Sequence, residues 1–460
     1  MSKTYRPYNP DQMFLLPPSL KEWLPEDHLV FFIDEVFNGL DLSAIEQVYE
    51  QEERGYPPYD PQMMVKVLFY AQCVGVRSSR KIERRIQEDV AFRILAANNF
   101  PKFRAISNFR RRHLKALAAL FTQVLGMCDQ AGLVKLKHVA LDGTKIKANA
   151  SKHKAMSYGR MKESEEQLTK EIERYLRKDQ EIDEREDRKY GADVRGDELP
   201  PELATREKRL EWIRAAKAAL EAAAREEQAK ENDDDDPPAP TDPGPAKPSK
   251  RGRRKTSSGT PKDKMQYNFT DPESRIMLNA DKAFIQGYNA QAVVDSGSQI
   301  VVAADVTNQA SDNPQLPQMM RAVKTNLGRN PKEISADAGF FSRANLEFLA
   351  SEEIDALIPP DKQRHNSGQS CSPRGRIPKN LSLADRMRRK LRTKHGREGY
   401  ALRKYTVEPV FGQIKAARGF TSFLLRGLEK VRAEWLIACT AHNLLKLRNA
   451  RLRATAAAVM

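Results

Sequence analysis

The sequence is poor in cysteine, which limits the kinds of site that the chain is expected to contain. Its 4 cysteines lie far apart and form no CxxC pair: Cys73, Cys128, Cys371 and Cys439. Closely spaced cysteines are the usual mark of a structural zinc site or of a disulfide framework. We therefore expect reduced thiols, as in a cytoplasmic protein, and no cysteine-based metal site.

Long apolar runs are also absent, and histidine is scarce. No apolar stretch approaches the roughly 18–20 residues that span a bilayer. The first residues, MSKTYRPYNPDQMF, contain no apolar core of a secretory signal. The 7 histidines are scattered, so we expect His138 and His442 to be packing or surface residues rather than metal ligands. These absences argue against a membrane protein and against a histidine-rich site.

Positive charge, by contrast, is in excess. The chain of 460 residues has 78 Lys and Arg against 62 Asp and Glu, which gives a formal net charge of +16. An excess of this size favours a polyanionic partner. Because no membrane-spanning segment is expected, we predict that this partner is nucleic acid.

Residues 1–135 are expected to form an all-helical domain. Asp60 and Pro61 have the residue types that begin a helix. A second helix is predicted over 80–95, where apolar residues recur at every fourth position, and Ser107 is expected to cap a third. Several polar faces are basic: Arg80, Lys81, Arg84, Arg85, Arg110, Arg111 and Arg112. Such faces suit a DNA-binding domain and are equally compatible with an ordinary solvated surface.

A long polar insertion separates this region from the rest of the chain. It follows a short β-type run, KHVALDG at 137–143. Residues 151–227 have leucines and isoleucines at helical spacing among many charges, which predicts an exposed helical hairpin. Residues 228–265 are rich in Asp, Pro and Ser and contain few apolar residues, so a disordered linker is expected there.

The β pattern resumes after the insertion. Strands are predicted over 287–295, 299–307, 332–337 and 354–360, helices over 314–327 and 343–352, a basic loop over 361–399, and helix from about 405. Residues 136–150 and 266–450 are therefore expected to form one α/β domain, a mixed sheet with helices on its faces. This is the element order of an RNase H-like fold, although the order alone fits other α/β folds.

Three acids occupy the ends or starts of these elements. Asp142 and Asp337 each end a predicted strand, where side chains point into crevices, and Glu408 begins a predicted helix. Phosphodiester cleavage often uses two divalent ions about 3.5–4 Å apart, and Mg²⁺ prefers oxygen ligands. Single acids at strand ends are more often turn or cap residues. Their positions therefore make a metal site possible without making it the expected one.

The motifs around the acids resemble those of a known family. ALDGTKIKANAS (140–151) and ISADAGFFS (334–342) resemble the first two acidic motifs of bacterial insertion-sequence DDE transposases. YALRKYTVEPVFGQIKAARGF (400–420) resembles the third, in the branch with a Y-x2-R-x3-E-x6-K signature. NFTDPESRIM, GYNAQAVVD and AHNLLKL are also similar, so the resemblance covers most of the chain and is weakest over the insertion.

The resemblance implies which residues perform catalysis. Asp142, Asp337 and Glu408 fall on the three catalytic, metal-binding acids of the family. Lys415 stands at the position of the signature lysine, seven residues after Glu408, and on one uniform helix the two would share a face. The expected role of Lys415 is a contact with DNA.

Tyr400 and Arg403 match the first part of the signature. Four residues rather than three separate Arg403 from Glu408, so Lys404 occupies the strictly spaced position. The sequence leaves open which of the two cations takes the arginine's role, and we expect DNA contacts from Tyr400, Arg403 and Lys404.

As a whole, the resemblance implies an enzyme that excises and inserts a mobile DNA element. It implies an RNase H-like catalytic core, two Mg²⁺ ions with Mn²⁺ as a substitute, and double-stranded DNA with terminal inverted repeats as substrate. A homodimer or higher assembly in the DNA complex and action at the bacterial nucleoid are also expected. Two alternatives remain: a non-catalytic DNA-binding protein derived from a transposase, and a metal-dependent nuclease on the same fold. The presence of all three acids argues against the first alternative only.

Overall fold

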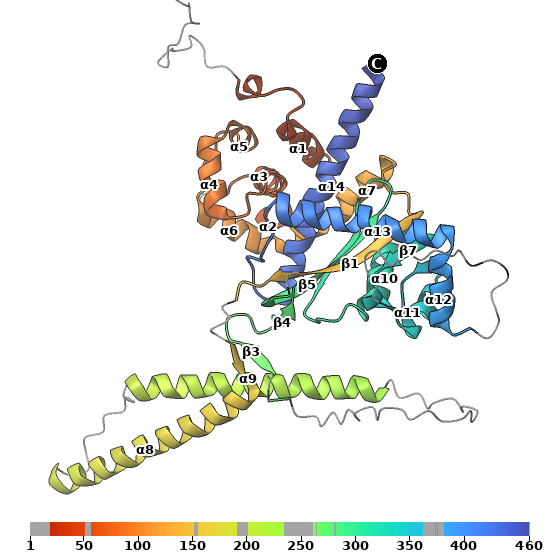
Figure 1. The fold of residues 1–460 in the computed structure, drawn as a ribbon. Helices are drawn as coiled ribbons and strands as arrows, with labels where there is room; N and C mark the ends of the chain where they lie inside the picture. The colour runs from red at the N-terminus through yellow and green to blue at the C-terminus, as the bar shows by residue number, and fades with distance from the viewer. Residues whose placement is uncertain are drawn as a thin grey trace, which may run out of the picture. The chain divides into compact units, whose positions relative to one another are not determined.

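The structure is a computed structural model that describes residues 19–50, 57–150, 155–190, 201–233, 261–263, 265–279, 282–361, 373, 375 and 381–459. It divides into two compact units (Figure 1). The first comprises residues 1–148 and 277–460, and the second comprises residues 149–276.

A mixed sheet forms the centre of the first unit. Its strands are β1 (His138–Lys147), β4 (Arg275–Leu278), β5 (Phe284–Asp295), β6 (Val301–Thr307), β7 (Glu333–Ala336) and β8 (Asp355–Leu357). β5 pairs antiparallel with β1 and with β6, whereas β7 is parallel to β1 and β8 is parallel to β7. The order β6-β5-β1-β7-β8, with β4 also on β5, is the mixed α/β arrangement of an RNase H-like fold that the sequence predicts.

Helices cover the sheet. They are α10 (Gln315–Leu327), α11 (Arg343–Ser351), α12 (Leu383–Arg392), α13 (Lys394–Gly412) and α14 (Leu428–Val459). α13 packs along β1, β7 and β8, and α10 packs on β6 and β5. Trp435 of α14 is fully buried and its indole N–H donates to the Gln291 carbonyl at 2.9 Å, so this residue packs in the core.

The N-terminal region is helical, as predicted. Its helices are η1 (Leu20–Trp23), α1 (Leu29–Asn38), α2 (Ser43–Glu50), α3 (Pro61–Cys73), α4 (Ser79–Glu88), α5 (Val90–Leu95), α6 (Phe103–Arg112) and α7 (Leu114–Gln130). Asp60 caps α3 by accepting from the Met63 N–H at 2.8 Å. Two details of the prediction are wrong. The helix expected over 80–95 breaks at Asp89, which caps α5, and Ser107 lies inside α6 instead of capping a helix.

The prediction of a basic loop over 361–399 is also wrong for the second half of that range, because α12 and the start of α13 lie there. Ser382 and Thr393 cap these helices with their hydroxyl oxygens. Only Met387 and Leu391 of α12 are buried, so the sequence has no continuous apolar stripe that would reveal the helix.

The second unit is a helical hairpin closed by a small sheet. β2 (Ala155–Ser157) pairs antiparallel with β3 (Gln266–Asn268) at the two ends of the hairpin formed by α8 (Tyr158–Tyr190) and α9 (Pro201–Asp233). Its own core comprises Tyr158, Met161, Leu168, Ile172, Leu210, Ile213, Ala216 and Leu220. α9 continues to Asp233, past the expected start of the linker, and most of the remaining linker lies outside the described residues.

Two expectations about composition can be compared with this fold. Cys73, Cys128 and Cys439 are buried free thiols, whereas Cys371 lies outside the described residues. Within the part of the chain that the structure describes, no helix has the length and apolar character needed to cross a membrane.

Candidate active site

Asp142 lies in the middle of β1, so the expectation that it ends a strand is wrong. β5 pairs with β1 as far as Lys147, which keeps the strand extended beyond the acid. β7, on the other side, pairs with β1 only as far as Leu141, which faces Ala336. The carboxylate therefore stands where the parallel partner strand ends, although its own strand continues.

Asp337 is the residue after Ala336 and therefore comes next to Asp142 in the parallel register. Neighbouring in-register residues direct their side chains to the same face of a sheet. The Asp337 side chain caps the 3-10 turn η3 (Ala338–Phe340) by accepting from the Gly339 N–H at 2.9 Å. The structure thus brings together two acids that are 195 positions apart in the sequence (337 − 142).

Arg403 of α13 contacts the first acid directly. Its Nη2 lies 2.8 Å from Asp142 Oδ2, and only 18% and 16% of the two side chains are exposed. Burial raises the pKa of Asp142, the charge and hydrogen bond of Arg403 oppose this rise, and the charge of Asp337 adds to it. Burial is the largest single influence on the pKa of Arg403 and lowers it, but the charge and hydrogen bond of Asp142, together with the charges of Tyr400 and Asp337, outweigh burial and raise the pKa.

Tyr400 and Lys404 lie on either side of this pair in the sequence. Tyr400 is one helical turn before Arg403 and hydrogen-bonds to its guanidinium; burial raises the pKa of the phenol and Arg403 opposes the rise. Lys404 is exposed and makes no ion pair with a described residue. Arg403, and not the strictly spaced Lys404, is therefore the cation that contacts Asp142.

Glu408 does not begin a helix, and the expected interaction with the positive helix end is wrong. α13 begins at Lys394 because Thr393 caps it, so Glu408 lies in the last part of the helix. Its carboxylate is exposed and makes no hydrogen bond or ion pair with the residues that the structure describes, including Asp142 and Asp337. The third acid is therefore close to Arg403 in sequence, but the ligand atoms of Asp142, Asp337 and Glu408 do not all lie within 4.8 Å of one another.

Pro409, inside α13, alters the helix beside Glu408. A proline has no N–H to donate to the carbonyl four residues earlier, here that of Tyr405. Gln299 supplies the missing donor, with its Nε2 at 2.7 Å from the Tyr405 oxygen. A π-helical turn, η4 (Gln413–Ala417), follows.

Lys415 lies in this π-helical turn. Its Nζ donates to Thr144 Oγ1 at 3.0 Å, two residues beyond Asp142 and on the same face of β1. The helix changes from α to π between Glu408 and Lys415. The prediction that the two residues share one face of a uniform helix therefore does not apply.

The opposite face of β1 carries a polar network that the sequence did not reveal. Asp312 Oδ1 accepts from Lys145 Nζ at 3.0 Å, Asn289 Nδ2 at 2.6 Å and Gln291 Nε2 at 2.8 Å. A Cβ on Gly143 would lie 2.4 Å from Gln291 Nε2, so a side chain at this position would displace that amide from the network. The GYNAQAVVD motif supplies two of these residues and was the available signal.

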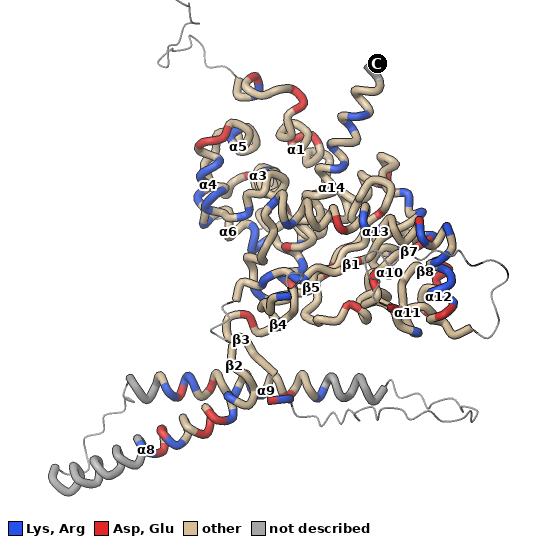
Figure 2. The backbone as a smooth tube through the Cα atoms, in the orientation of Figure 1, with Lys and Arg blue, Asp and Glu red and all other residues tan. Residues whose placement is uncertain are grey.

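Lys and Arg residues are concentrated along α4 and α12 (Figure 2). On α4 the exposed cations are Arg80, Lys81, Arg84 and Arg85. Arg110 of α6 does not belong to this surface: it is half-buried, donates to the Arg77 carbonyl at 3.1 Å, and burial lowers its pKa. The basic faces expected from the sequence are therefore only partly available to a partner.

The structure combines an RNase H-like sheet, two neighbouring aspartates at the end of β7 and a basic surface. This combination is typical of enzymes that cleave nucleic acids with the help of divalent metal ions. Comparison with family models narrows the class. Residues 18–112 match the model described as Transposase domain (DUF772), and residues 255–444 match the model described as Transposase DDE domain. The chain belongs to the insertion-sequence DDE transposases, which bind DNA, cleave it and transfer its strands in a reaction that depends on divalent metal ions.

The matched ranges include Asp337 and Glu408 but not Asp142, which lies in the interval between them. The register of β1 and β7 places the first acid beside the second. Searches of curated proteins and of solved structures gave no match.

Proposed function

We propose that this transposase excises and inserts a mobile element at its terminal inverted repeats, and that Asp142, Asp337 and Glu408 hold two Mg²⁺ ions, for which Mn²⁺ can substitute. The observation that carries the proposal is the parallel register of Leu141 with Ala336, which makes Asp142 and Asp337 neighbours.

The chemistry of the donors fits such ions. Asp142 Oδ1 accepts only from the adjacent Gly143 N–H among the described residues, which leaves lone pairs for a cation. Burial and the charge of Asp337 both disfavour ionised Asp142, and a nearby divalent cation would offset both effects. Carboxylate oxygens are the ligands that Mg²⁺ prefers. When bound, the ions neutralise the scissile phosphate and activate the attacking oxygen.

The protein's own side chains have distinct roles in this proposal. Arg403 orients Asp142 and keeps it ionised, and Tyr400 orients Arg403. Glu408 supplies the third carboxylate. Its exposed side chain makes no hydrogen bond or ion pair with a described residue, so no such interaction has to break before it binds an ion. Lys404 and Lys415 contact the phosphate backbone, and the bond to Thr144 holds Lys415 on the same face of β1 as Asp142.

The exposed cations of α4 contact the DNA ends, since Arg84 and Arg85 form only partly exposed ion pairs, with Glu88 and Asp89, that a phosphate could replace. A reaction that joins two ends of one element needs two active sites, so the DNA complex contains at least two copies of the chain.

The test is an incubation of the full chain with Mg²⁺ and DNA that carries the native flanking repeats, followed by analysis of cut and joined products. We expect both products from the unchanged protein. Asp142→Asn, Asp337→Asn and Glu408→Gln should each lower cleavage by about 10³-fold or more, in line with the loss of a group that acts only in the transition state, while DNA binding changes little. Glu347→Gln, an exposed acid on α11, is the matched control.

Near-normal cleavage by any one of the three variants would remove that residue from the metal site. Cut DNA without joined product, even with a supplied target, would instead identify a nuclease on the same fold. DNA binding without cleavage in Mg²⁺ or Mn²⁺ would contradict the catalytic proposal.

A further inference from the structure

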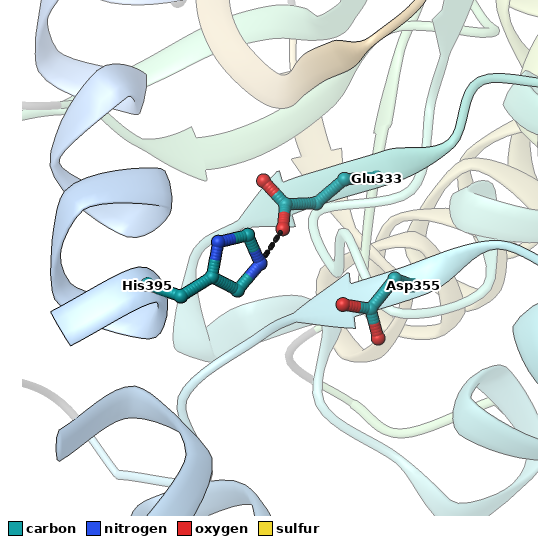
Figure 3. Close-up of side chains that lie close together, drawn as sticks. All are labelled: Glu333, Asp355 and His395. Carbon is teal, nitrogen blue, oxygen red and sulfur yellow. Dashed lines mark ion pairs between the residues drawn. The ribbon is translucent and has the colours of Figure 1, made fainter. Parts of the chain in front are cut away.

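A second group of metal-ligating side chains lies at the opposite end of β7 from Asp337. Glu333 begins β7, Asp355 begins β8, and the two residues pair in the parallel register. His395, the second residue of α13, places its Nε2 2.7 Å from Glu333 Oε2 (Figure 3). One ligand atom from each of these three residues, called here the His395 cluster, lies within 4.8 Å of the others.

His138 lies beside the His395 cluster, on a third strand of the same sheet. It begins β1 and pairs with Glu333, so its side chain lies on the same face of the sheet. Only 4% of His138 is exposed, and neither ring nitrogen has a hydrogen-bond partner among the described residues. Buried imidazole nitrogens normally have a hydrogen-bond partner, so an ion at the cluster would supply a partner that His138 lacks.

We propose that the His395 cluster, with His138 behind it, binds one divalent transition-metal ion of the zinc type. Imidazole together with carboxylate is a donor set that zinc accepts and that Mg²⁺, which prefers oxygen alone, does not favour. Zinc bonds of about 2.0–2.1 Å place tetrahedral ligand atoms about 3.4 Å apart. The atoms of the cluster are close enough to reach this spacing by small side-chain rotations.

Lys390 is the competitor for this site. Its ammonium group pairs with Asp355 and also donates to the Ala356 carbonyl at 2.9 Å, so it keeps a partner if Asp355 turns to the ion. Asp355 and Lys390 both line a surface cavity of about 670 Å³, which gives an ion a route from solvent.

The position of the cluster on α13 suggests what the ion does. His395 lies eight residues before Arg403 on the same helix, and Gly399 between them is so close to the sheet that an added Cβ would lie 2.8 Å from Glu333 Oε1. A bound ion would tie the first turn of α13 to β7 and β8. The same helix carries Arg403 and Glu408 at its other end, so the ion would fix their position without entering the reaction.

The experiment uses the full chain, stripped with a chelator and titrated with Zn²⁺ in saturating Mg²⁺. Bound zinc is counted after desalting, and Co²⁺ replaces it for absorption spectra. We expect one zinc equivalent, with affinity at least tenfold lower in His395→Ala and Glu333→Gln, and higher in Lys390→Met. His395 is 69% exposed, so its removal should leave the fold intact, which circular dichroism checks.

Two control variants locate the ion. His28→Asn removes an imidazole but keeps a residue type that caps α1, and should bind zinc normally. Asp142→Asn should also retain the zinc equivalent. Equal zinc binding by His395→Ala and the unchanged chain, or loss of zinc in Asp142→Asn, would overturn the proposal. A Co²⁺ spectrum typical of ligation by oxygen alone would also overturn it.

Discussion

At the scale of single residues, the Asp142–Arg403 pair has the clearest consequence. Burial raises the pKa of Asp142, and Arg403 is the main influence that opposes the rise. In Arg403→Gln the pKa of Asp142 should therefore rise further. Because the proposed metal site needs ionised Asp142, the acid limb of the pH profile of cleavage should move to higher pH.

The measurement is the rate of DNA cleavage against pH at subsaturating divalent ion. Lys404→Gln is the control, since Lys404 neighbours Arg403 but does not contact Asp142, and its acid limb should stay in place. Arg403→Gln with an unshifted acid limb would show that Arg403 does not tune Asp142.

At the scale of elements, the irregular end of α13 has a cause that can be tested. Gln299 donates to the Tyr405 carbonyl that Pro409 leaves without a helical N–H. Gln299→Ala should lower the free energy of unfolding by about 1 kcal/mol, the usual contribution of one hydrogen bond. In a Pro409→Ala background the helix supplies its own donor, so the loss should be smaller by about 0.5–1 kcal/mol.

A double-mutant cycle measured by urea unfolding gives this difference. The contacts of Gln299 with Lys446 and Gln413 are the same in both backgrounds and cancel. Additive effects of the two substitutions would mean that Gln299 does not replace the missing donor.

The elements also show why the sequence predicted some parts of the fold and not others. β5, β6, β7 and β8 were predicted because their apolar runs are local signals, whereas the short strands β3 and β4 were not predicted. β1 was cut short at Gly143 because the polar residues beyond it are held extended by β5, more than a hundred positions later. α12 and the start of α13 were missed because few of their side chains are buried.

For the candidate site too, the sequence predicted which residues belong to it but not how they are arranged in space. The motifs located Asp142, Asp337 and Glu408, but only the register of β1 and β7 placed the first two together. The choice between Arg403 and Lys404 depended on which side chain meets Asp142 across 261 positions, and no local pattern contains that information.

At the scale of the whole molecule, the net charge of +16 predicts DNA binding that weakens steeply with salt. Each lost phosphate contact lowers the slope of log K against log salt concentration by about one unit. Lys415→Ala should lower the slope by about this amount and weaken binding to all sequences alike. Filter binding over a salt series measures it, with Lys324→Ala on α10 as the control, since Lys324 pairs with Glu352. An unchanged slope would rule out the phosphate contact of Lys415.

The separate core of the hairpin predicts two unfolding transitions. Every member of that core comes from residues 158–220. Ile213→Ala should destabilise the hairpin by about 2–5 kcal/mol, as for other buried isoleucines. It should leave the transition of the first unit unchanged.

Tryptophan fluorescence separates the two transitions. Trp435 is fully buried in the first unit, whereas Trp212 on α9 is 68% exposed and should report little change. Circular dichroism follows the helices of both units. A shift of the Trp435 transition in Ile213→Ala would mean that the two units unfold together.

The pairing of β2 with β3 also bears on how the chain is synthesised and folds. Ala155 lies opposite Asn268, so the ends of an insertion of more than a hundred residues meet. Once the hairpin has formed, β1 and β5 are separated by a short tether instead of a long loop, which lowers the entropy lost when they pair. On the ribosome, the strand that carries Asp142 must wait for its partner. The hairpin is therefore expected to fold first, and pairing of β1 with β5 to follow within seconds of the synthesis of β5.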